Sequence, residues 1–151
     1  MVLTDPDLLK GREAVDVCRQ AVRGGATMIQ VRWKGAAPAR LADLTRSLVA
    51  ALDVPILVND RVDVALAAGA AGAHLGWDDL PLDVARGLVP PGFLLGLSVG
   101  SPEEAARARD LPADYWSVGP ALPPVPSRTP VRRWAPRDSP GWPARRPRVS
   151  P

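Results

Sequence analysis

PILVNDRVDVALAAGAAGAHL, residues 55–75, is the stretch that decides the fold. An aliphatic run from Pro55 to Val58 leads through polar residues into an alanine-rich and valine-rich stretch, 62–68, and then into a second apolar run, 72–75. Gly69 stands where a helix ends. The order predicts a strand, a helix and a second strand. The nearly all-apolar strands are typical of a parallel sheet that helices cover.

The same order extends in both directions through residues 1–118. We expect strands at 2–4, 27–31, 55–58, 72–75, 93–97 and 115–118, with helices at 12–23, 38–52, 62–68, 82–88 and 102–109. Such repeats imply a parallel α/β sheet with right-handed crossovers. The pattern alone leaves a barrel and an open sheet as alternatives, because a complete (β/α)₈ barrel needs eight units and at least ~200 residues.

Composition excludes several classes of protein. The chain has 151 residues, 46% of them hydrophobic, which is enough to bury the core of one domain. Its single cysteine, Cys18, and single histidine, His74, exclude an internal disulfide and any mechanism built on a His pair or a Cys/His cluster. No apolar run approaches membrane-spanning length and no signal-type segment follows Met1, so we expect a cytoplasmic protein without membrane contact.

Charge and proline content separate the end of the chain from the rest. Residues 1–118 hold 12 Lys/Arg and 15 Asp/Glu, whereas residues 119–151 hold 7 and 1, with 10 of the 18 prolines. A segment so poor in long aliphatic side chains cannot offset the entropy of ordering. We therefore expect a folded domain at 1–120 and a disordered, basic Pro/Arg-rich tail at 121–151.

Polar side chains gather where the predicted strands end. Gln30, Arg32 and Lys34 alternate with Val31 and Trp33, so the three polar side chains leave one face of the second strand. Two cations and an amide there suit an anionic or heteroaromatic ligand. A solvated strand end is the alternative interpretation.

Carboxylates follow the next two strands. Asn59 and Asp60 come after the third strand, and Asp78 and Asp79 come after the fourth. Asn59 or Asp60 could instead cap the helix that begins near Val62. Because neighbouring parallel strands end side by side, two carboxylates with ligand oxygens and water would form a site for a hard cation such as Mg²⁺.

The remaining candidates have structural alternatives. His74 is flanked by apolar residues and is more typical of a hydrogen-bonded core residue than of a base. Ser98, at the end of the fifth strand, could meet a phosphate. Cys18 lies on an apolar helix stripe and is expected to pack, while Trp33 and Trp77 could line a pocket or cover the core.

Six segments together resemble the thiamine phosphate synthase family. They match it in order and spacing across residues 2–120, and although each is weak alone, six in register are specific. They are Leu3-Thr4-Asp5-Pro6, residues 24–34 (GGATMIQVRWK), 58–63 (VNDRVD), 72–81 (GAHLGWDDLP), Gly96-Leu97-Ser98 and 114–120 (DYWSVGP).

The resemblance implies a TIM-type (β/α)₈ barrel, of which about six units are present here. It implies a transferase of thiamine biosynthesis that joins the hydroxymethylpyrimidine group of a diphosphate to thiazole phosphate, releasing pyrophosphate with Mg²⁺. The diphosphate leaves first and the thiazole nitrogen captures a pyrimidine cation, so no covalent nucleophile is needed. The implied substrate-binding residues are Gln30, Val31, Arg32, Trp33, Lys34, Asn59 and Ser98, and the implied metal ligands are Asp60 and Asp79.

A sister family, the thiazole tautomerases, shares the barrel and uses a histidine shortly after the fifth strand. Here that stretch is Ser98-Val99-Gly100-Ser101. The missing histidine and the presence of Asp79 favour the synthase over a tautomerase-like protein.

The resemblance breaks after Gly119-Pro120. Codons compatible with residues 124–144, read one base out of phase, can encode the Lys-Pro-Asp-Ala-Gly segment that family members carry next. Our hypothesis is that the sequence is frameshifted from about residue 122, which leaves activity open and predicts poor solubility or self-association through exposed barrel edges. A non-catalytic remnant, or an interaction protein with a polyanion-binding tail, is the alternative, although nucleic acid is disfavoured because the tail has no repeat and no lysine.

Overall fold

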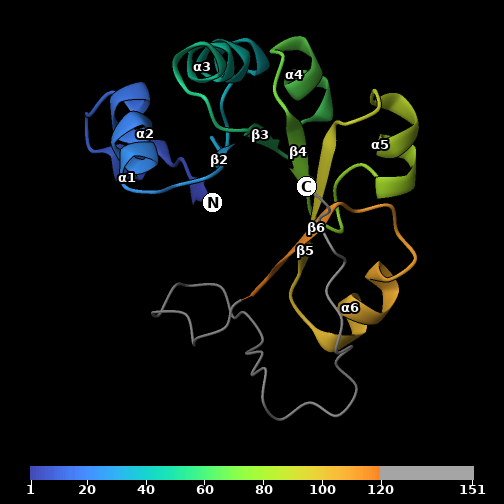
Figure 1. Ribbon diagram of the computed structural model, residues 1–151. Coiled ribbons are helices and arrows are strands. Elements are labelled where there is room, and N and C mark those ends of the chain that lie inside the picture. The colour runs from blue at the N-terminus through green and yellow to red at the C-terminus, as the bar shows by residue number, and fades with distance from the viewer. Residues whose placement is uncertain (120–151) are drawn as a thin grey trace.

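A computed structural model describes residues 1–119 as alternating strands and helices (Figure 1). The strands are β1 (Val2–Leu3), β2 (Ile29–Val31), β3 (Ile56–Asn59), β4 (Gly72–Leu75), β5 (Leu94–Val99) and β6 (Tyr115–Val118). The helices are α1 (Pro6–Leu9), α2 (Ala14–Arg23), α3 (Pro38–Ala51), α4 (Val62–Ala67), α5 (Leu82–Leu88) and α6 (Pro102–Ala108). The expected tail, 121–151, lies outside the described residues, and so does the frameshift hypothesis.

The strands form one parallel sheet in the order β1-β2-β3-β4-β5-β6. Figure 1 shows the sheet curled, with α2, α3, α4 and α5 arranged in an arc around its outer side. A doubly wound sheet reverses its strand order, whereas a barrel keeps neighbours in sequence order. The described strands therefore form a half-barrel of the TIM type, which confirms the predicted α/β class and decides between the two alternatives.

Alternation along each strand gives the sheet two different faces. Outward-facing residues such as Val31, Val58 and Leu95 are fully buried and join one aliphatic cluster beneath the helices. Cys18 is part of that cluster at 2% exposure, as predicted, and burial raises the pKa of its thiol. Inward-facing residues such as Gln30 lie outside the cluster. The core is thus the layer between sheet and helices.

Glycine is required at position 72 of β4, which packs tightly against β5. A Cβ added to Gly72 would lie 2.2 Å from the carbonyl oxygen of Leu94. Because that atom belongs to the backbone, it cannot move aside as a flexible side chain would. Gly69, with φ +70, ends α4 as the sequence predicted.

The predicted elements differ from the observed ones at a few places. Helix α1 was not expected, because a single turn is too short for apolar periodicity to reveal. Strand β5 continues to Val99, so Ser98 lies within the strand and not at its end. Helix α2 begins at Ala14, two residues later than predicted. Among residues 1–119, no helix is long and apolar enough to cross a membrane.

Candidate functional site

Four charged side chains from three successive strand ends meet at the C-terminal rim of the sheet. Arg32 and Lys34 follow β2, Asp60 follows β3 and Asp79 follows β4. Asp60 lies within hydrogen-bonding reach of Asp79 and within electrostatic reach of both cations. The structure therefore brings together the carboxylates and cations that the sequence placed on separate βα turns.

The pKa of Asp60 reflects the charges that surround it. Burial raises the pKa of its carboxyl group, and the neighbouring charge of Asp79 and the hydrogen bond between the two carboxyls raise it further. Lys34 and Arg32 oppose that shift. Two carboxylates held this close repel each other until a cation or a proton lies between them.

Asp60 also has an unusual backbone conformation. Its φ is +66°, a value that non-glycine residues rarely adopt. The N–H of Arg61 donates to the carbonyl oxygen of Asn59 at 2.8 Å, which closes a three-residue γ-turn around Asp60, and the N–H of Asp60 donates to the carbonyl oxygen of His74 at 2.8 Å. Strain of this kind persists where the surrounding structure enforces it and is typical of functional sites.

The alternative role of these residues as helix caps is wrong. Helix α4 begins at Val62 with Arg61 at the N-cap, and no side chain caps it. Neither Asn59 nor Asp60 is needed to begin the helix, because the γ-turn redirects the chain instead. The Asp60 carboxylate is therefore not used as a helix cap and lies at the rim.

Asp79 is held in place by its own loop. The N–H of Gly76 donates to its Oδ2 at 2.6 Å, whereas the neighbouring Asp78 is exposed. Of the two carboxylates in this loop, Asp79 is the one that faces Asp60.

The donor set fits Mg²⁺. Two facing carboxylates are ligands that a hard cation prefers, and Mg²⁺ usually takes one or two protein carboxylates and completes its shell with water and substrate oxygens. No group of three or more potential metal-ligating His, Cys, Asp or Glu residues occurs within residues 1–119. The rim thus offers part of a coordination shell and not a closed protein cage.

The Gln30-to-Lys34 segment divides between the two faces of the sheet. Gln30, at 1% exposure, lies on the inner face and Lys34 is exposed, while Arg32 pairs with Asp5 at 3.4 Å. Val31 and Trp33 point the other way and pack into the helix-covered core. The side chains of Val31 and Trp33 therefore do not face the rim.

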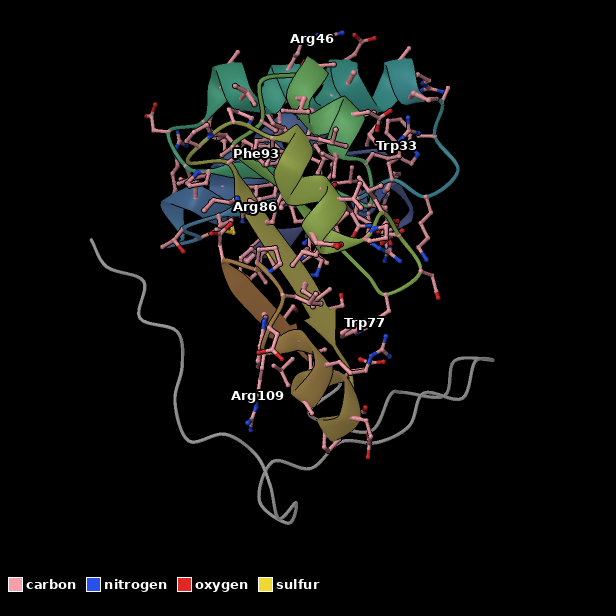
Figure 2. All side chains as sticks on the ribbon, turned by 90° about the vertical axis from the view of Figure 1, so that its right-hand side faces the viewer. Trp33, Arg46, Trp77, Arg86, Phe93 and Arg109 are labelled. Atoms are coloured by element: carbon pink, nitrogen blue, oxygen red, sulfur yellow. The ribbon has the colours of Figure 1, made fainter. Side chains whose placement is uncertain are left out.

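Trp33 and Trp77 have different surroundings (Figure 2). Trp33 covers core, with the guanidinium of Arg40 5.0 Å from the ring centroid. Trp77 lines a cavity of about 240 Å³ together with Arg107, whose guanidinium lies 4.3 Å from the Trp77 ring centroid. Trp77 thus both lines a pocket and covers core, and residues of α5 and α6 contribute to the walls of that pocket.

A line of hydrogen bonds crosses the inner face beside the rim. His74 Nε2 lies 2.9 Å from Ser98 Oγ, and His74 Nδ1 lies 2.9 Å from Tyr115 Oη. His74 is 5% exposed, and burial lowers the pKa of its imidazole, an effect that the charge of Asp79 opposes. His74 is therefore buried and hydrogen-bonded, as predicted, although it lies on the inner face and not in the helix-covered core.

Sequence reasoning missed Tyr115 and Gly96. Both lie in register with His74 across β4, β5 and β6. Asn59, the partner of His74 in β3, is half-buried on the same face. A histidine, a glycine and a tyrosine on consecutive strands form a signal that only a correct strand register reveals.

These features define a class of protein. A sheet that curls in sequence order, with carboxylates and cations converging on its C-terminal rim, defines a barrel-type α/β protein. Residues 1–133 match the family model described as Thiamine monophosphate synthase (TMP-TENI). The chain belongs to this family, which confirms the resemblance found in the sequence.

Individual relatives agree with that assignment. The chain is 44% identical over 124 residues to a thiamine-phosphate synthase of Syntrophomonas wolfei, covering 80% of this chain and 59% of the relative. It is 47% identical over 127 residues to one of Methanoculleus marisnigri, with the same coverage. A solved thiamine phosphate pyrophosphorylase from Pyrococcus furiosus superposes with a TM-score of 0.73 at 37% identity, covering 81% of this chain and 60% of that structure. The chain thus spans about three fifths of the length of these relatives.

Proposed function

We propose that the chain acts in thiamine biosynthesis as a transferase of the synthase type. The reaction couples a hydroxymethylpyrimidine diphosphate to a thiazole phosphate and releases pyrophosphate, with Mg²⁺ as the cofactor. One observation carries this proposal: Asp60, Asp79, Arg32 and Lys34 converge on one rim in a chain of the thiamine monophosphate synthase family.

The charges at the rim suit a diphosphate. Arg32 and Lys34 would bind phosphate oxygens through charge-assisted hydrogen bonds and offset the negative charge that grows as pyrophosphate departs. Asp60 and Asp79 would hold Mg²⁺, which when bound neutralises charge on the leaving diphosphate. Asn59 of β3 and Ser98 of β5 lie on the two strands that flank β4, and their side chains would orient the same substrate.

The nucleophile in this reaction belongs to the second substrate. Cys18 is buried in the core beneath the helices, and both ring nitrogens of His74 are already hydrogen-bonded. Neither residue is therefore placed to attack a substrate carbon. A dissociative transfer asks the protein for charge stabilisation and orientation, which is what the rim supplies.

A coupled assay tests the proposal. The full chain, given both phosphorylated precursors and Mg²⁺, is expected to form thiamine phosphate and pyrophosphate. Asp60→Asn and Asp79→Asn should each lower the rate at least about 100-fold, because each removes a charge that the transition state requires. Calorimetry of Mg²⁺-pyrophosphate binding provides a second measurement that does not depend on the thiazole substrate.

Matched controls lie next to each carboxylate. Asp78→Asn and Asp63→Asn alter exposed neighbours and should leave both measurements unchanged. The proposal fails if the wild-type chain neither forms product nor binds Mg²⁺-pyrophosphate. It also fails if the rim variants behave like their controls.

A further inference from the structure

The hydrogen bonds of the line on the inner face have a fixed order of donors and acceptors. Four side chains contribute to it: Gln30 from β2, His74 from β4, Ser98 from β5 and Tyr115 from β6. Gln30 hydrogen-bonds the hydroxyl of Tyr115, which contacts His74 Nδ1, and His74 Nε2 contacts Ser98 Oγ. Each atom is a donor or an acceptor, so fixing one proton fixes the next.

Gly96 makes the line possible. His74 and Tyr115 lie on opposite sides of β5, in register with Gly96 between them. A Cβ at position 96 would lie 2.2 Å from Tyr115 Cζ and 2.5 Å from His74 Nδ1. Only a residue without a side chain lets the phenol and the imidazole meet across the strand.

The order of donors and acceptors is set first at the phenol of Tyr115. The side-chain amide of Gln30 can donate to Tyr115 Oη, which leaves the phenolic proton for another acceptor. Two acceptors are near: His74 Nδ1 at 2.9 Å and Met1 Sδ at 3.9 Å. Nitrogen at the shorter distance is much the stronger acceptor. Burial raises the pKa of Tyr115 to about 12, so the phenol keeps its proton at neutral pH.

The imidazole of His74 continues the same order of donors and acceptors. When Nδ1 accepts from the phenol, a neutral imidazole must hold its proton on Nε2. Two uncharged hydroxyl partners and 5% exposure favour the neutral ring over the imidazolium. Nε2–H then donates to Ser98 Oγ, so the hydroxyl proton of Ser98 is not used within the line.

We propose that Gln30, Tyr115 and His74 form a one-way donor chain that leaves the Ser98 hydroxyl proton free to bind a phosphate oxyanion at the rim. Tyr115 and His74 are positioning residues in this arrangement. The identity of the oxyanion, a substrate diphosphate, rests on the proposed function; the direction of the chain does not.

The same direction gives Ser98 a defined chemistry. A histidine that holds its proton on Nε2 cannot accept the proton of the serine beside it. The Ser98–His74 contact therefore resembles the nucleophile–base pair of a hydrolase in distance only. Ser98 is a hydrogen-bond donor and not a nucleophile.

The chain's composition makes the experiment selective. His74 is the only histidine, so long-range ¹H–¹⁵N spectra of the uniformly ¹⁵N-labelled full chain at neutral pH contain one imidazole. We expect ¹⁵N shifts of a protonated Nε2 and an unprotonated Nδ1. The opposite tautomer, or an imidazolium, in the wild-type protein overturns the proposal without recourse to any variant.

Variants test how the tautomer is enforced. Tyr115→Phe removes the donor and should populate the Nδ1–H tautomer. It should also weaken Mg²⁺-pyrophosphate binding about tenfold, and Ser98→Ala should have the same effect, since each costs one charge-assisted hydrogen bond. Trp116→Phe alters the adjacent residue on the opposite face and should change neither the tautomer nor binding. An unchanged tautomer in Tyr115→Phe overturns the proposal.

The two proposals fail separately. The tautomer is read without ligand, so a protein with Nε2–H that binds no Mg²⁺-pyrophosphate and forms no product contradicts the proposed function and leaves the donor chain intact. A protein with Nδ1–H that still forms thiamine phosphate contradicts the donor chain and leaves the proposed function intact.

Discussion

The two faces of the sheet are stabilised in different ways, although the same strands carry both. On the outer face, Leu95 and its neighbours are fully buried against the helices and stabilise the fold by filling volume. On the inner face, His74 and Tyr115 hydrogen-bond across Gly96, where an added methyl group has no room. The outer face thus requires apolar bulk, whereas the inner face requires particular donors, acceptors and one missing side chain.

This difference separates stability from chemistry along a single strand. Aliphatic exchanges that conserve volume are tolerated in a core. A hydrogen-bonded line tolerates no exchange that removes a donor or an acceptor, because a buried partner is then left unsatisfied. Substitutions on the outer face, on the inner face and at the rim should therefore have different effects, and four measurements test that expectation.

The largest effect is expected on the outer face. Leu95→Ala should lower the free energy of unfolding by about 3 kcal/mol, because it opens a cavity beneath the helices. The His74 imidazole shifts of the folded protein should not move. Leu88→Ala, at a side chain that is 62% exposed, is the control and should cost less than about 0.5 kcal/mol in the same urea titrations. A changed tautomer in Leu95→Ala would mean that the two faces are coupled.

The second effect belongs to the inner face and depends on pH. Burial raises the pKa of Tyr115 to about 12, whereas the phenol of the unfolded chain ionises near its ordinary value of 10. Between these values the unfolded chain loses the proton first, so the free energy of unfolding falls as pH rises from 10 to 12. The full shift corresponds to about 2.7 kcal/mol, which partial exposure reduces to about 2 kcal/mol.

The measurement is direct because Tyr115 is the only tyrosine. Its tyrosinate absorbance should titrate near 12 in the folded protein and near 10 in urea. Tyr115→Phe should lack this part of the alkaline loss of stability. A folded-state midpoint near 10 would place the phenol in water and remove it from the inner-face line.

The sequence predicted the outer face well for a physical reason. Apolar runs bounded by turn residues, such as Pro55 to Val58, record burial beneath helices, and burial is a local property of each strand. All six strands and every helix except α1 were found in this way. The rim carboxylates were also predictable, because parallel strands end at one edge and Asp60 and Asp79 each follow such a strand.

The inner face was less predictable because its order is not local. The contact between His74 and Tyr115 joins residues 41 positions apart and depends on Gly96 lying in register between them. Alternation predicts that Val31 and Trp33 point away from Gln30, but resemblance to a family motif assigns all three to the site. The γ-turn at Asp60 is a property of the backbone. Asparagine and aspartate tolerate such a turn, but their presence in a sequence does not predict it.

The third effect has the opposite sign to the others. Asp60→Gly should raise the free energy of unfolding by about 1 kcal/mol, since glycine relieves the strain at φ +66° and the repulsion from Asp79 disappears. Lys10→Gly relieves a similar strain at φ +51° in a residue outside the group of rim charges and is the matched control for the backbone term. Of the two variants, only Asp60→Gly should lose Mg²⁺-pyrophosphate binding. If Asp60→Gly were destabilising, its carboxylate would have a structural role.

The smallest effect tests whether position on the rim, and not nearness in sequence, sets the importance of a carboxylate. Asp63 lies three residues after Asp60 but is exposed, and Arg61 Nε donates to its Oδ1 at 2.8 Å. That hydrogen bond lowers the pKa of Asp63, so its small stabilising contribution is present above pH 4 and is lost as pH falls. Exposed pairs of this kind contribute little, and Asp63→Asn should cost about 0.5 kcal/mol or less. A double-mutant cycle with Arg61→Gln measures the pair directly. A coupling well above 1 kcal/mol, or a loss of Mg²⁺-pyrophosphate binding in Asp63→Asn, would contradict this prediction. It would mean that the functional rim extends into α4.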